Sequence, residues 1–189
     1  EKIGMVFQHF NLFNNKTVIE NIMLSPVLCE KRRMRKLRRQ RTLGKADTKE
    51  PVKTTKQIKE EAHKNALELL DRIGLADKAD VYPSQLSGGQ KQRVAVAVSM
   101  ICGKDLLVFD EPTSGLDFDS MTQVAGLIRR LSNMGKVIFI VTHDFEFVCR
   151  TCSRVLHFDE GEMPDDVPVT MDALPKLREL FSVSDGKER

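Results

Sequence analysis

The chain has 189 residues, of which 41% are hydrophobic, so it can bury one sizeable core and is too short for several independent domains. Its longest apolar run, Val94–Cys102, is about half as long as a membrane-spanning helix requires. The four cysteines are too few for a disulfide framework and favour a reducing compartment. The Cys149-Arg150-Thr151-Cys152 spacing is interpreted as two ordinary helix-face residues, with a redox role as the alternative.

The formal net charge of +3 is unevenly distributed along the chain. Between Lys31 and Lys59 there are 13 Lys or Arg and 2 acidic residues, a local net of +11, so the remainder carries −8. Three interpretations of segment 31–57 compete: a solvated insertion, which is favoured, a patch for anionic lipid headgroups, and a nucleic-acid contact. The basic run has no aromatic residue to stack bases, which counts against nucleic acid.

The N-terminal part of the chain predicts one strand and one short helix. The apolar run Ile3–Phe7 is typical of a strand that delivers a polar residue at its carboxyl end. A helix is expected over Thr17–Leu24, capped by Asn15 or Thr17 and ending before the next proline. The basic run Lys31–Arg41 then indicates a solvated helix end, and Thr42–Gln57 a mobile loop.

Helices and strands alternate through the remainder of the chain. Glu60–Ile73 is amphipathic at three- and four-residue spacing, and Gly74 supplies a stop. The elements expected after it are the helix Gln90–Cys102, the strand Leu106–Phe109, the helix Asp119–Leu131, the strands Val137–Val141 and Val155–Phe158, and the helix Asp172–Phe181. Because the strands are uninterrupted apolar runs between helices, a parallel sheet covered on both faces is predicted.

Ionisable side chains follow two of these strands. Asp110 and Glu111 come directly after one, and His143 follows the next. Each group alone more often has a structural role, as an acid in a turn or as a histidine whose hydrogen bonds are satisfied within the fold. Together they indicate a nucleotide site, because the carboxyl ends of parallel strands meet at the edge where α/β sheets bind ligands.

A glycine-containing turn carries the closest resemblance to a known family. Leu86-Ser87-Gly88-Gly89-Gln90 resembles the signature motif of ABC ATPases, and other motifs appear in that family's order. These are Gln8 as the Q-loop residue, Tyr82–Gln85 as the lead-in to the signature, Leu106–Pro112 as the Walker B strand, Ser114–Asp117 as the D-loop and His143 as the switch histidine. The resemblance spans residues 3–161.

The resemblance implies an α/β fold of the P-loop NTPase (RecA-like) type, a parallel sheet core with an inserted ABC helical sub-domain. Residues 1–8 would form the core strand leading to the Q-loop, 9–93 the helical sub-domain with the insertion 31–57, 94–161 the rest of the core, and 162–189 a tail helix. The N-terminal β sub-domain and the phosphate loop would be absent, since no G-x-x-x-x-G-K-[ST] occurs. The first residue is Glu1, so a missing N-terminal part is expected.

The resemblance also implies ATP and Mg²⁺ as cofactors. In this family Asp110 would orient Mg²⁺, and Glu111 would act as general base or position the attacking water. The two are expected to point in different directions on an extended strand. Gln8 would touch the metal or that water, and His143 would bond the γ-phosphate.

The remaining implied residues act between subunits. Ser87, Gly88, Gly89 and Gln90 would contact ATP held by a second ATPase subunit in a head-to-tail dimer, because glycines let the backbone approach phosphate at a helix N-terminus. Asp117 would communicate across that dimer. Transmembrane permease subunits are the other implied partners, at the cytoplasmic face of the plasma membrane. Without a phosphate loop, these residues alone are expected to bind ATP very weakly and hydrolyse none.

Different segments of the chain resemble ABC ATPases of two subfamilies, which transport different classes of substrate. Residues 5–22 look like ATPases of polar amino acid importers, whereas 94–99, 118–120 and 142–149 look more like those of energy-coupling factor transporters for vitamins. The favoured function is the ATP-binding subunit of an ABC importer, for polar amino acids. The alternatives are vitamin uptake, a catalytically inactive fragment and a soluble nucleic-acid-associated ABC protein, although a nucleic-acid partner is disfavoured.

Overall fold

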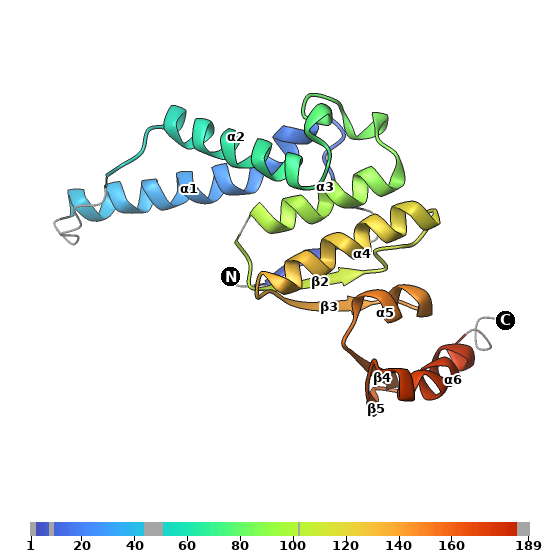
Figure 1. Cartoon of the computed structure of the whole chain (residues 1–189). Helices are drawn as coiled ribbons and strands as arrows, with labels where there is room; N and C mark the ends of the chain where they lie inside the picture. Colours follow the sequence, from blue (N-terminus) through green and yellow to red (C-terminus); the bar gives the residue numbers. More distant parts are fainter. Residues whose placement is uncertain (1–2, 8–9, 44–50, 102, 185–189) are drawn as a thin grey trace.

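The computed structural model describes residues 3–7, 10–43, 51–101 and 103–184. Three parallel strands form the central sheet in the order β1-β2-β3, with bounds Ile3–Val6, Leu106–Asp110 and Val137–Val141. Helices α3 (Gly88–Ile101) and α4 (Phe118–Asn133) lie over the sheet, and the N-terminal helices lie beyond them (Figure 1). The expected α/β architecture with a parallel sheet is therefore confirmed.

The two faces of the sheet have different environments. On one face Val6, Leu107 and Phe109 are buried in the main core together with α3 and α4. The opposite face is exposed at six apolar positions: Ile3, Met5, Phe7, Val137, Phe139 and Val141. The prediction that both faces are covered is thus wrong for the described residues. Alternate side chains of a strand point to opposite faces, and the described helices pack on one face alone.

Helices α1 (Val18–Thr42) and α2 (Thr55–Arg72) form a long hairpin. The cap at Thr17 is confirmed by a capping box with Glu20. The expected helix end before Pro26 is wrong, because α1 continues through this proline. Proline removes one helical hydrogen bond, but α1 buries apolar side chains both before and after it, and this packing outweighs the local propensity.

Helix α2 also begins earlier than expected, at Thr55, because Thr54 and Gln57 form a capping box, which apolar periodicity does not reveal. The helix ends at Arg72 with Ile73 as its cap, and the expected glycine, Gly74, follows with a φ of +68°. The predicted loop 42–57 is therefore helical at Thr42 and from Thr55 to Gln57, and residues 44–50 lie outside the described residues.

The C-terminal part forms a separate small layer (Figure 1). Helix α5 (Phe145–Thr151) leads to β4 (Arg154–Asp159), which pairs antiparallel with β5 (Glu162–Pro168), and α6 (Leu174–Ser184) follows. Single-turn 3-10 helices span Ala76–Lys78, Pro83–Gln85 and Met171–Ala173.

The strand predicted at Val155–Phe158 exists, but its expected place in the parallel sheet is wrong. The chain reverses directly after Asp159 through two residues with positive φ, Glu160 at 48° and Gly161 at 86°. Such backbone favours a hairpin, so β4 pairs with the segment that follows it. The expected tail therefore contains a strand before its helix, and of that helix's apolar residues Leu177 is fully buried.

Candidate nucleotide site

The acid and histidine that follow β2 and β3 are brought together as expected. The Glu111 backbone N–H donates to the Val141 carbonyl oxygen at 2.9 Å, which extends the pairing of the two strands. Nδ1 of His143 lies 3.0 Å from Oε1 of Glu111, and the Thr142 hydroxyl donates to Oε2 at 3.3 Å. The Glu111 side chain is 21% exposed and that of His143 is 72% exposed. A carboxylate is therefore held at the sheet edge beside an accessible imidazole.

The backbone at Glu111 differs from the expected extended strand. Asp110 is the last residue of β2, but Glu111 has a φ of +44°, in the left-handed region that non-glycine residues rarely adopt. The two carboxylates are separated by this sharp change of backbone direction and not by strand alternation. Left-handed non-glycine backbone costs about 1–3 kcal/mol and is often retained where function requires the geometry.

A third acid, whose role sequence reasoning missed, locks the loop after β2 to the helix after β3. The buried Thr113 hydroxyl donates to Oδ2 of Asp144 at 3.1 Å. Oδ1 of Asp144 accepts from the Phe147 N–H at 2.9 Å and so caps α5. The signal was available, since an aspartate directly before a helix is a favoured cap residue. Asp144 thereby fixes the loop that carries His143.

The signature turn forms the start of α3. The Ser87 hydroxyl accepts from the Gln90 N–H at 3.3 Å, and Oε1 of Gln90 accepts from the Ser87 N–H at 2.9 Å. This reciprocal pair is a capping box. The next two N–H groups, of Gly88 and Gly89, have no acceptor within an α-helix because of their position in its first turn. They lie at the positive end of the helix dipole, where an anion is favoured.

The two signature glycines also allow α3 to approach α4 and the loop before it closely. A Cβ at residue 89 would lie 2.5 Å from the Ser120 hydroxyl oxygen, and one at residue 88 would lie 3.2 Å from a methyl of Leu116. The expected reason for these glycines was close approach to phosphate. The structure adds a packing reason, because a side chain at residue 89 would push the helices apart.

Asp117 lies at the same contact between the two helices. Its Oδ1 accepts from the Ser120 N–H at 2.7 Å and caps α4. This hydrogen bond holds the pKa of Asp117 below its ordinary value. The D-loop aspartate and the signature are therefore joined through one helix contact.

A half-buried arginine ties the signature helix to the hairpin. Nη1 of Arg93 donates to the Ile73 carbonyl oxygen at 2.9 Å, at the carboxyl end of α2. A cation at this end is favoured by the helix dipole, although burial lowers the pKa of Arg93.

The residues at the strand ends and the signature turn lie on the same side of the molecule. The carboxyl ends of β2 and β3 and the first turns of α3, α4 and α5 all lie to the right in Figure 1. Gln8, expected at the metal, lies outside the described residues. Among the described residues no group of three or more His, Cys, Asp or Glu could hold a metal ion. The lone Asp110 carboxylate still fits Mg²⁺, which takes one or two carboxylates and completes its shell with phosphates and waters.

Other features lie away from this edge. A groove of about 250 Å³ runs between Asn11–Phe13 and α1, bordered by Leu28 and Arg32. Burial raises the pKa of Cys149 and of Cys152, which disfavours thiolate formation and weakens the redox alternative. Among the described residues, no helix combines the length and apolar character needed to cross a membrane.

Comparison with known proteins shows the family. The glutamine transport ATP-binding protein GlnQ of Bacillus subtilis is 38% identical over 177 residues, covering 93% of this chain and 63% of the relative. The arginine transport ATP-binding protein ArtM of the same organism is 39% identical, covering 88% and 59%. The chain thus spans about six-tenths of the length of the curated relatives it matches.

A solved structure agrees with these relatives. The dimeric, post-hydrolysis ATP-binding cassette MJ0796, bound to ADP and phosphate, superposes with a TM-score of 0.63 at 30% identity, covering 90% of this chain and 64% of that one. The family model described as ABC transporter matches residues 1–114. The P-loop NTPase fold expected from the signature and Walker B motifs is confirmed, and the chain belongs to the ABC transporter family.

Proposed function

We propose that the chain is part of the ATP-binding subunit of an ABC importer for polar amino acids. GlnQ, the glutamine transport relative, matches across both regions that resemble different subfamilies, which favours amino acids over vitamins. The observation that carries the ATP-binding proposal is the first turn of α3. Its Gly88 and Gly89 N–H groups have no acceptor within the helix because of their position in its first turn, and this turn lies on the side where Glu111 and His143 meet.

In this proposal the ends of β2 and β3 perform the hydrolytic chemistry. Asp110 would hold Mg²⁺, and the metal would supply positive charge to neutralise the phosphates of bound ATP. Glu111 orients the attacking water or accepts its proton, and its carboxylate is kept in place by Thr142 and His143. His143 is exposed enough to donate to a γ-phosphate oxygen. Gln8 is proposed to contact the metal or the water.

The signature acts on ATP bound to a second ATPase subunit, in a head-to-tail dimer. A single N–H pair at a helix end binds phosphate weakly, and a phosphate loop must come from residues outside these 189. Asp117, through α4, would link the two ATP sites. The permease subunits would place this dimer at the cytoplasmic face of the membrane. The division of the chain at residues 8, 93 and 161 remains part of this proposal.

ATP-dependent association with a full-length relative tests the proposal. The purified chain, mixed with full-length GlnQ, is expected to elute as a mixed dimer with Mg-ATP and separately without nucleotide. Ser87→Arg should abolish the mixed dimer, because a bulky cation would block the first turn of α3. Ser84→Arg adds the same side chain at an exposed position three residues earlier and should leave the dimer intact. Association without nucleotide, or insensitive to Ser87→Arg, would contradict the proposal.

A further inference from the structure

The outer half of the helical hairpin forms an ordered arm in its described residues. We define the basic arm as residues 27–43 of α1 and its carboxyl cap with residues 52–61 of α2 and its N-terminal approach. Its own small core consists of Met34, Leu37 and Ile58, which are buried, with Val27 and Val52 packed against them. The described residues of the segment favoured as a solvated insertion therefore include parts of two helices that share an apolar seam.

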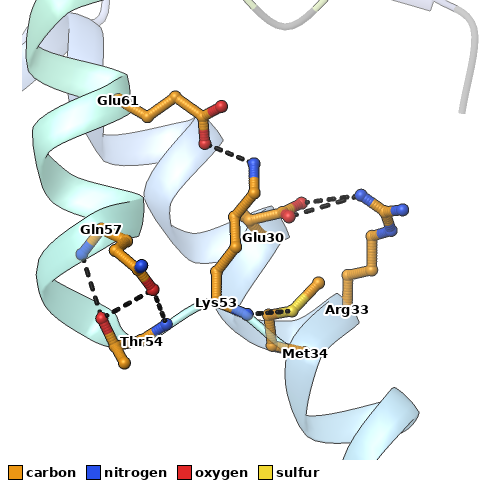
Figure 2. Close-up of polar contacts among 7 residues, drawn as sticks. All are labelled: Glu30, Arg33, Met34, Lys53, Thr54, Gln57 and Glu61. Carbon is orange, nitrogen blue, oxygen red and sulfur yellow. Dashed lines mark hydrogen bonds and ion pairs between the residues drawn. The ribbon is translucent and has the colours of Figure 1, made fainter. Parts of the chain in front are cut away.

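Polar contacts fix the two helices of the basic arm together. Figure 2 shows the Lys53 backbone N–H donating to the Met34 sulfur, at 3.3 Å, directly beside the capping box that starts α2. The Lys53 ammonium pairs with Glu61 on α2, and Arg33 pairs with Glu30 on α1 at 3.3 Å. These pairs neutralise cations on the flanks of the seam.

The outer face of the basic arm keeps its charge. Four exposed cations lie on the outer side of α1: Arg32, Arg35, Lys36 and Arg39. At 100° per residue, Arg32 and Arg39 stand opposite the side that Met34 and Leu37 share, and Arg35 and Lys36 lie about 50° to either side of that direction. None of the four forms an ion pair with another residue in the described part of the chain. We call this set the cationic stripe.

Exposed leucines lie at both ends of the cationic stripe, on the same face of the helix. Leu28 is 48% exposed and Leu43 is 56% exposed. They are fifteen positions apart in the sequence, so they stand about 22 Å apart along the axis. A face with cations along its middle and an apolar side chain at each end matches the interface of a bilayer, which takes up apolar groups beneath a layer of charged headgroups.

We propose that the cationic stripe, with Leu28 and Leu43, binds the anionic lipid headgroups of a bilayer surface. This inference goes beyond the proposed function and needs no nucleotide. Phosphate-bearing lipids supply the complementary charge, and the leucines insert beside them. Nucleic acid is the less favoured partner, because it offers no apolar site for the leucines and the arm has no aromatic residue to stack on bases.

Vesicle flotation with the full 189-residue chain tests this proposal, in the absence of nucleotide. Binding is expected to vesicles of 70% phosphatidylcholine and 30% phosphatidylglycerol, and not to phosphatidylcholine alone. Each removed cation should weaken partitioning about fivefold, so replacing all four residues of the stripe by Gln should lower it by about a hundredfold or more. A matched control removes four exposed cations elsewhere, Lys64, Arg72, Arg129 and Arg130, and should lower it less than tenfold.

Replacing the leucines separates lipid from nucleic acid while keeping the charge. Leu28→Gln with Leu43→Gln should weaken vesicle binding about tenfold or more, since each buried leucine contributes to partitioning. The same variant should leave retention on duplex DNA unchanged. Circular dichroism checks that every variant keeps its helices. The proposal is overturned if the control variant loses vesicle binding equally, or if replacing the leucines leaves vesicle binding unchanged. It is also overturned if the chain binds DNA but not anionic vesicles.

Discussion

The two faces of the central sheet contain similar residues in opposite environments. Phe109 on β2 is fully buried beneath α3 and α4, whereas Phe139, on the neighbouring strand, is 48% exposed on the other face. Both lie in apolar runs that look alike in the sequence. The difference teaches that hydrophobic character specifies a strand with two apolar faces but does not determine which face the described helices cover.

The largest expected change in stability distinguishes these two phenylalanines. Phe109→Ala should lower the free energy of unfolding by about 3–5 kcal/mol, because it leaves a cavity in the main core. Phe139→Ala should change it by less than about 0.5 kcal/mol, as is usual for surface sites. Urea unfolding followed by circular dichroism measures both. Equal losses would mean that the second face is covered in solution.

A pair of methionines extends the comparison to the basic arm. Met34→Ala should cost about 2 kcal/mol, at the low end for buried methionine, because its satellite core is small. Met5→Ala, on the exposed face of the sheet, should cost less than about 0.5 kcal/mol. The same unfolding assay applies. A negligible cost at Met34 would show that the arm is not held by its apolar seam.

A smaller loss of stability is expected at the contact between α3 and α4, on the covered side of the sheet. Gly89→Ala should cost about 1–2 kcal/mol, because the new Cβ would collide with Ser120. Adding Ser120→Gly should recover part of that loss. Gly126→Ala is the matched control on α4, where a Cβ meets nothing within 4 Å, and it should raise stability slightly. If Gly89→Ala left the free energy of unfolding unchanged, the packing explanation for this glycine would be refuted.

The smallest effect concerns the pH dependence at Asp117. Its pKa is lowered by the Ser120 N–H, so its contribution to stability is complete above the ordinary aspartate pKa of about 4. The contribution is lost as the pH falls through the lower pKa of the folded state. Asp117→Asn keeps a good cap and should flatten this part of the profile. Unfolding curves between pH 2 and pH 6 compare the two proteins, and parallel profiles would contradict the prediction.

The positions of the motif residues at strand ends were predictable from the sequence, but the conformation and contacts of the loops were not. Asp110, Glu111 and His143 could be placed together because parallel strands end at one edge. The left-handed backbone of Glu111 and the tie between Thr113 and Asp144 depend on how loops distant in sequence meet.

The helical hairpin shows the same limit. Local propensity predicted an end of α1 before Pro26, but packing on both sides of the proline carries the helix onward. The seam of Met34, Leu37 and Ile58 has too few apolar residues to stand out within a strongly charged segment. The turn after Asp159, by contrast, could have been anticipated from Gly161.

Hydrolysis in a mixed dimer tests the central claim, that this chain supplies the signature side of an ATP site. Full-length GlnQ, with the serine of its expected signature motif replaced by arginine, is proposed to provide a phosphate loop without a working signature. Mixed with the chain and Mg-ATP, it is expected to turn over ATP faster than the two proteins assayed separately, and Ser87→Arg in the chain should remove the gain. No gain on mixing, a gain that survives Ser87→Arg, or turnover by the chain alone would contradict the account.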